Sequence, residues 1–148
     1  MLELARWSTR AGRDGAVRPM VELPLRIAGY DIDFAGHVNN AVYVRWLEDL
    51  RTVWMTRWLP LEECPTRGIM PVLARIEIDY RAPLRLADRA VGRVWVTSAG
   101  RASAVMESEI ARAADGRLCA HALQTVAFVD LTSGRPTRVP PEFREAMS

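Results

Sequence analysis

The segment from Ala41 to Leu59 constrains the fold most strongly, because it has the pattern of a long helix that is apolar around most of its circumference. Its polar side chains fall on one narrow stripe, at i, i+3, i+4, i+7 and i+11: Arg45, Glu48, Asp49, Thr52 and Thr56. On that stripe Arg45 and Asp49 are spaced to pair at i, i+4. Pro60 ends the helix. A helix with so wide an apolar surface must be buried on several sides.

Most of the remaining chain alternates apolar and polar residues with the period of two that is typical of β-strands. Strands are expected at 21–28, 75–80, 89–97, 102–113 and 118–130, with loops at 31–38, 61–71 and 81–88 and a short helical turn within 140–147. Pro24 favours an edge or the start of a sheet for the first strand. The Asp115-Gly116 pair favours a hairpin between the last two strands.

These elements predict an α+β fold in which a strongly curved antiparallel sheet wraps around the one long central helix. We expect the last four strands to form a meander. The length of 148 residues suits one domain. We expect residues 1–19 to be a poorly ordered extension and residues 20–148 to be the folded domain. A sheet of this kind has an edge strand on which a second copy can pair, so a homodimer or a dimer of dimers is expected.

Composition excludes several classes of function. The formal net charge of +2 is too small to indicate nucleic acid as the partner. No apolar run approaches the roughly 20 residues that a membrane span requires. The two cysteines, Cys64 and Cys119, are far apart and have no further ligands at metal-site spacing. We therefore expect reduced thiols, a cytoplasmic location, and neither a metal nor a cofactor.

Asp33 is the most promising catalytic group, because it lies in a glycine-containing loop shortly before the predicted helix. A helix N-terminus presents unpaired backbone N–H groups and partial positive charge. Such groups can stabilise the oxygen of a carbonyl as it becomes negative, while a nearby carboxylate attacks the carbonyl or activates water. The alternative is that Asp33, like Asp31, only accepts hydrogen bonds from loop amides.

The run from Tyr30 to Asn40, YDIDFAGHVNN, followed by Tyr43, Trp46 and Glu48, resembles the signature of hot-dog-fold acyl-CoA thioesterases of the 4-hydroxybenzoyl-CoA thioesterase type. The resemblance extends over roughly residues 20 to 145, through IEIDY at 76–80 and FVD at 128–130. It implies that Asp33 is the catalytic carboxylate and that a backbone N–H of Asn40 or its neighbour holds the oxyanion. Whether Asp33 attacks directly or activates water stays open.

Other residues are candidates for substrate binding: Gly36, His37, Asn39, Tyr43, Arg81 and Arg85. The alternative for His37 is a hydrogen bond that orders the loop, and one of the two asparagines is expected to cap the helix. Arg81 and Arg85, with Arg89, could form a rim that binds the phosphates of coenzyme A.

The resemblance implies an acyl-CoA thioesterase that needs no cofactor, with a thioester of acyl carrier protein as a close variant of the substrate. A second hypothesis is a hot-dog protein that binds an acyl thioester without cleaving it, and the presence of Asp33 argues against it. A hot-dog hydratase requires a different arrangement of Asp and His on the loop that enters the helix.

Overall fold

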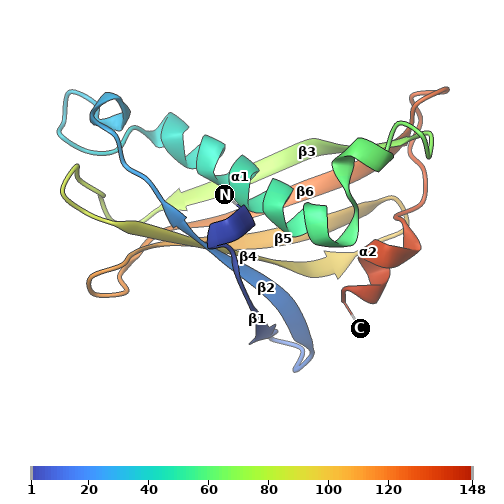
Figure 1. Cartoon of the computed structure of the whole chain (residues 1–148), viewed down its shortest axis with the longest axis horizontal. Helices are drawn as coiled ribbons and strands as arrows, with labels where there is room; N and C mark the ends of the chain where they lie inside the picture. The colour runs from blue at the N-terminus through green and yellow to red at the C-terminus, as the bar shows by residue number, and fades with distance from the viewer. Residues whose placement is uncertain (1, 148) are drawn as a thin grey trace.

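The structure, a computed structural model, describes residues 2–147 and has one antiparallel sheet with one long helix (Figure 1). The strands are β1 (Arg6–Ala11), β2 (Val17–Leu25), β3 (Ile69–Tyr80), β4 (Ala90–Ala99), β5 (Ser103–Arg112) and β6 (Leu118–Asp130). The helices are α1 (Asn40–Trp58) and α2 (Pro141–Glu145), with single 3-10 turns at η1 (Leu2–Leu4), η2 (Gly29–Asp31) and η3 (Leu61–Glu63). None of the described helices is long and apolar enough to span a membrane.

The core lies between α1 and the inner face of the sheet. Leu47, Leu50 and Trp54 of α1 are fully buried. They pack in one cluster with inward-facing strand residues such as Val94 and Met106. Gly92 of β4 lets the helix approach closely, since a Cβ built at that position would lie 2.7 Å from Leu50 Cδ1. The predicted α+β architecture, with a curved antiparallel sheet on one long helix, is therefore confirmed.

The predicted meander of the last four strands is wrong. The strand order is β1-β2-β4-β5-β6-β3, so only β4, β5 and β6 follow one another as neighbours. β3 crosses to the far side of β6 and pairs with it from Ile69↔Asp130 to Tyr80↔Ala120. This position makes β3 an edge strand, which explains why Pro71, expected in a loop, can lie within it.

β2 is an interior strand rather than the predicted edge, and its two prolines show how this is possible. Pro19 pairs with β1, but the pairing of β2 with β4 begins only at Met20. Pro24 pairs with β4, but the pairing of β2 with β1 ends at Glu22. Each proline thus lies where β2 has a neighbour on one side only, a position that tolerates proline because the missing N–H can face the open side.

Residues 1–19 are expected from the sequence to be a poorly ordered extension, whereas the structure places η1, β1 and the start of β2 among them. β1 and β2 form an antiparallel hairpin with the register Arg6↔Glu22 to Ala11↔Val17. On one side of the hairpin Trp7 packs against the core, with the Arg57 guanidinium 4.5 Å from its ring centroid. On the other side Arg10 lies over the ring of Trp95. Contacts with distant residues hold a strand whose own sequence is mostly polar.

Candidate active site

The loop that enters α1 is held in place mainly by backbone hydrogen bonds. The Asp33 N–H donates to the His37 carbonyl at 2.9 Å, and the Gly36 N–H donates to the Asp33 carbonyl at 3.0 Å. Gly36 has a φ of +79°, a left-handed conformation that favours glycine. The Val38 N–H donates to the Leu84 carbonyl at 2.8 Å, which ties this loop to the loop after β3.

The Asp33 carboxylate is fixed through one of its oxygens. Oδ1 accepts the Ala35 N–H at 2.9 Å and the His37 N–H at 3.4 Å. Within residues 2–147 the second oxygen, Oδ2, accepts no hydrogen bond. The side chain is only partly buried. Asp33 therefore has the loop-ordering role considered above, and it keeps one oxygen free for chemistry.

The N-terminus of α1 provides an open N–H beside this loop. Asn39 is the N-cap, and its Oδ1 accepts the Ala41 N–H at 2.9 Å. The Val42 N–H donates to the Asn39 carbonyl. Among the described residues no acceptor faces the backbone N–H of Asn40. Of the first N–H groups of the helix, that of Asn40 is thus available for an external oxygen.

A shallow cleft of about 260 Å³ lies at this end of the helix. It brings together four of the predicted site residues, His37, Asn40, Tyr43 and Arg81. Gly36, Asn39 and Arg85 do not line it, and Arg85 is exposed, with its backbone N–H bonded to Asp88. Asp33 does not line it either, although the loop hydrogen bonds hold Asp33 next to His37, which does.

Tyr80, a residue that the sequence analysis did not select, lines the same cleft. Its hydroxyl donates to the Asn40 carbonyl at 3.0 Å, and its ring packs edge-on against Tyr43 with the centroids 5.2 Å apart. Burial raises the pKa of Tyr43 to about 12, helped by Cys119 and Tyr80, so the Tyr43 hydroxyl stays neutral. The alternation of Ile76, Ile78 and Tyr80 could have identified Tyr80 as a site residue, since alternate residues of a strand share one face and here that face is turned toward the helix.

The contacts of Asp31, the first aspartate of the motif, indicate that it stabilises the fold. Its side chain is buried, accepts the Ala28 N–H at 2.8 Å and forms an ion pair with Arg45 at 2.7 Å. The predicted pair of Arg45 with Asp49 is therefore wrong. Asp49 is half-buried, and burial together with the neighbouring Glu48 raises the pKa of its carboxyl, although Arg45 acts in the opposite direction.

A curved antiparallel sheet on one long helix, with a motif of Asp, Gly, His and Asn at the helix entrance, defines a hot-dog protein. The family model of the thioesterase-like superfamily matches residues 28–147, and the chain belongs to that superfamily.

Two curated relatives are similar over most of this chain. It is 26% identical to the long-chain acyl-CoA thioesterase FadM of Escherichia coli over 127 residues, which are 86% of this chain and 96% of FadM. It is 27% identical to the acyl-acyl carrier protein thioesterase ATL2 of Arabidopsis thaliana over 124 residues, which are 83% of this chain and 65% of ATL2.

Solved structures share the fold. A Thermus thermophilus thioesterase complexed with coenzyme A and zinc superimposes with a TM-score of 0.73 at 29% identity, covering 85% of this chain and 90% of that one. A 1,4-dihydroxy-2-naphthoyl-CoA thioesterase from Synechocystis has a TM-score of 0.78 at 21% identity, covering 86% and 95% of the two chains. The expected fold and family are thereby confirmed.

Proposed function

We propose that this protein hydrolyses acyl-CoA thioesters to a free acid and coenzyme A. The observation that carries the proposal is that Asp33, with its free Oδ2, and the open Asn40 N–H lie on the same loop-to-helix junction. The similarity to FadM supports acyl-CoA as the substrate class. The similarity to ATL2 makes a thioester of acyl carrier protein the closest variant.

In the proposed reaction the thioester carbonyl oxygen accepts the Asn40 N–H, whose strength as a donor is increased by the partial positive charge of the helix terminus. Asp33 Oδ2 either attacks the carbonyl carbon or removes a proton from an attacking water. Direct attack expels the thiolate of coenzyme A and leaves a mixed anhydride on Asp33, which water then hydrolyses to the free acid. In the other route the activated water adds to the carbonyl carbon, and expulsion of the thiolate gives the free acid directly. His37 and Tyr43 line the cleft in which the thioester group lies.

We also propose that the active form is a homodimer that pairs along β3. This edge strand has 12 residues and exposes Val72, Leu73 and Tyr80 by at least 40% each. The opposite edge, β1, has only 6 residues. A long apolar edge strand favours pairing with a second copy. Leu73→Arg should shift the mass measured by light scattering to that of a monomer, and an unchanged mass would contradict pairing along β3.

A cytoplasmic location goes with this proposal, because Cys64 and Cys119 are both free thiols and that compartment keeps thiols reduced.

Release of free thiol from a panel of acyl-CoA and acyl carrier protein thioesters tests the function. We expect turnover of at least one acyl-CoA and a loss of kcat of about a thousandfold or more in Asp33→Asn, in line with the removal of a catalytic group. Binding without turnover by the unaltered protein would instead favour the non-catalytic hypothesis. Full activity of Asp33→Asn would contradict the site while leaving the reaction intact.

A further inference from the structure

One cavity lies on the outer face of the sheet, away from α1. It is a groove of about 530 Å³ between the tip of the N-terminal hairpin and the outward-facing side chains of β4, β5 and β6. Its wall includes Arg10, Arg13 and Arg18 of the hairpin. Its floor includes His121 and Leu123 of β6. The match to the family model begins only at residue 28, so the hairpin wall is outside the matched region.

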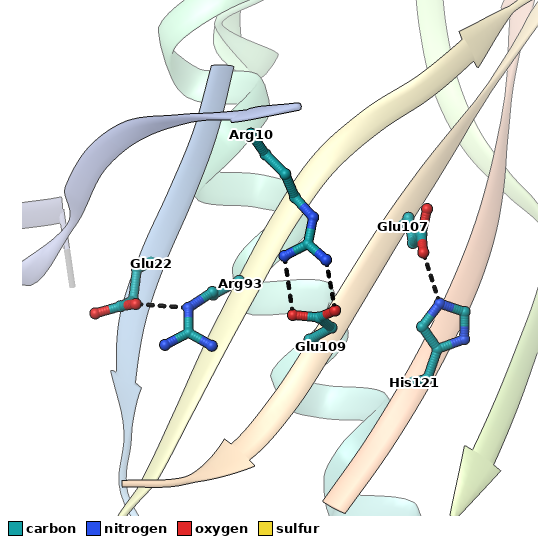
Figure 2. Close-up of polar contacts among 6 residues, drawn as sticks. All are labelled: Arg10, Glu22, Arg93, Glu107, Glu109 and His121. Atoms are coloured by element: carbon teal, nitrogen blue, oxygen red, sulfur yellow. Dashed lines mark hydrogen bonds and ion pairs between the residues drawn. The ribbon is translucent and has the colours of Figure 1, made fainter. Parts of the chain in front are cut away.

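Each of the three carboxylates that line this groove contacts a nitrogen-bearing side chain, and for two of them that side chain is an arginine. Arg10 donates two hydrogen bonds to Glu109, at 3.1 and 2.8 Å, and Glu107 lies 2.8 Å from His121 Nε2. Figure 2 shows both pairs on one face of the sheet, with both glutamates on β5, and a third pair outside the groove, Glu22 with Arg93. A carboxylate that is paired with arginine, as Glu109 is, repels an approaching anion less than an unpaired carboxylate does.

The third carboxylate, Asp14, accepts two hydrogen bonds from Arg18, at 2.9 and 2.6 Å. These bonds hold the pKa of Asp14 well below its ordinary value. Arg18 is only 7% exposed, and its buried Nε has no partner among the described residues. A Cβ on Gly12 would lie 2.2 Å from Arg18 Nη1, so the hairpin turn is built closely around this guanidinium.

Two guanidinium groups remain without a carboxylate partner among the described residues that line the groove, those of Arg13 and Arg81. Both side chains are exposed. Arg13 lies at the hairpin tip, whereas Arg81 follows the end of β3. Arg81 also lines the cleft beside Asn40, so one arginine borders both the groove and the candidate active site.

We propose that this groove binds the phosphate-bearing end of the thioester's carrier, the nucleotide of coenzyme A, with Arg81 near the active-site end and Arg13 at the far end. The inference rests on the proposed function. Guanidinium groups bind phosphate oxygens through paired, charge-assisted hydrogen bonds. Two unpaired guanidiniums at separate points of one groove suit a ligand that carries phosphates at separate positions. The hairpin thus serves as a specificity element for coenzyme A.

Kinetics with two carriers of one acyl group test the inference. Arg13→Ala should raise KM for the acyl-CoA by roughly tenfold, the effect expected from the loss of one charge-assisted contact, and should leave KM for the acyl-pantetheine unchanged. Arg13→Lys should recover part of the loss. Arg135→Ala, at an exposed arginine on another loop, is the matched control and should leave KM for both substrates unchanged. Equal KM values of Arg13→Ala and the unaltered protein for the acyl-CoA would overturn the proposal.

Calorimetry with adenosine 3′,5′-bisphosphate provides a second measurement that does not depend on turnover. The unaltered protein should bind this nucleotide, and Arg13→Ala should bind it roughly tenfold more weakly. Competition with the acyl-CoA is expected. Inhibition that is not competitive would show a site for a separate anion and overturn the role in carrier binding. If no thioester is hydrolysed, the proposed function fails, whereas the calorimetric result still decides whether the groove binds phosphates.

Discussion

The Tyr80 hydroxyl donates a hydrogen bond of 3.0 Å to the carbonyl of Asn40, the first residue of α1. An edge strand and the helix N-terminus are thereby joined across 40 positions of the sequence. This contact ties Asn40, whose backbone N–H we propose as the oxyanion donor, to the end of β3 through its carbonyl group.

Tyr80→Phe should remove this hydrogen bond and keep the ring contact with Tyr43. We expect the free energy of unfolding to fall by about 1 kcal/mol or less, because the site is partly exposed and the bond is neutral. We also expect kcat to fall by several-fold, although the loss of stability is small, because the helix terminus is held less firmly. Denaturant unfolding and steady-state kinetics on the same preparation check both values. An unchanged kcat would show that the hydrogen bond of Tyr80 does not affect the reaction.

The two aspartates of the motif should respond differently to removal of their charge. Asp31→Asn weakens a buried carboxylate that binds the Ala28 N–H and Arg45, so the free energy of unfolding should fall by about 2–3 kcal/mol. Asp33→Asn keeps an acceptor for the Ala35 N–H and should cost about 1 kcal/mol or less while abolishing turnover. Urea unfolding of both variants tests this contrast, and equal losses of stability would contradict it.

Gly92→Ala tests how closely α1 packs on the sheet. The added methyl group would meet Leu50 Cδ1 at 2.7 Å and Leu25 Cδ1 at 2.9 Å, and both leucines are buried. We expect a loss of about 1–3 kcal/mol in the free energy of unfolding from overpacking. Gly29→Ala, where a Cβ would meet nothing within 4 Å, is the matched control and should show little change. Equal stability of the two variants would contradict the packing.

A double-mutant cycle on Arg10 and Glu109 tests whether the N-terminal hairpin is held by this ion pair. The pair has two hydrogen bonds, and the Arg10 guanidinium lies 4.0 Å from the Trp95 ring centroid. We expect a coupling energy of about 0.5–1 kcal/mol at low salt that declines as salt increases, because both side chains are partly exposed. The cycle consists of Arg10→Ala, Glu109→Ala and the double variant, each unfolded in urea. A coupling energy of zero would mean that this ion pair does not hold the hairpin, and that Trp7 and the backbone hydrogen bonds between the strands do.

The ion pair in the hairpin between β5 and β6 should make the free energy of unfolding depend on pH in acid. Hydrogen bonds from Arg112 hold the pKa of Asp115 at about 2, below its ordinary value of 3.8. Because the folded-state pKa is the lower one, this pair stabilises the protein fully above about pH 4 and loses its effect as the pH falls toward 2. The stability difference between the unaltered protein and Asp115→Asn should therefore shrink between pH 5 and pH 2. A difference that does not change with pH would contradict the shift.

The local elements could be predicted where the pattern of neighbouring residues is strong. The predicted helix 41–59 differs from α1 by one residue at each end, and the predicted strand 118–130 coincides with β6. Both segments carry long apolar patterns and clear ends, at Pro60 and at the Asp115-Gly116 turn. The hexapeptide of β1 has neither, since it is short and mostly polar, and its order depends on Arg57, Trp95 and Glu109.

The candidate site also has one part that the sequence predicts and one part that it does not. The positions of Asp33, His37 and Asn40 around the helix entrance follow from a short contiguous motif, because backbone hydrogen bonds within that motif set its conformation. The pairing of Arg45 with Asp31 instead of Asp49 could not be predicted from helical spacing. It requires the turn at η2 to place a buried carboxylate near the guanidinium, and a buried carboxylate needs a cation more than an exposed one does.

The sequence by itself therefore determined the long helix, the last three strands, the family and the loop that carries Asp33, all of which depend on residues close together in the chain. Only the tertiary structure decided the strand order, the hairpin at the N-terminus and the contact of Tyr80 with Asn40. These features join residues up to 99 positions apart, as in the pair of Arg10 with Glu109. Such contacts form only when the sheet has curved around the helix. The periodicity of the sequence indicates which face of an element is buried, but it does not indicate which distant surface packs against that face.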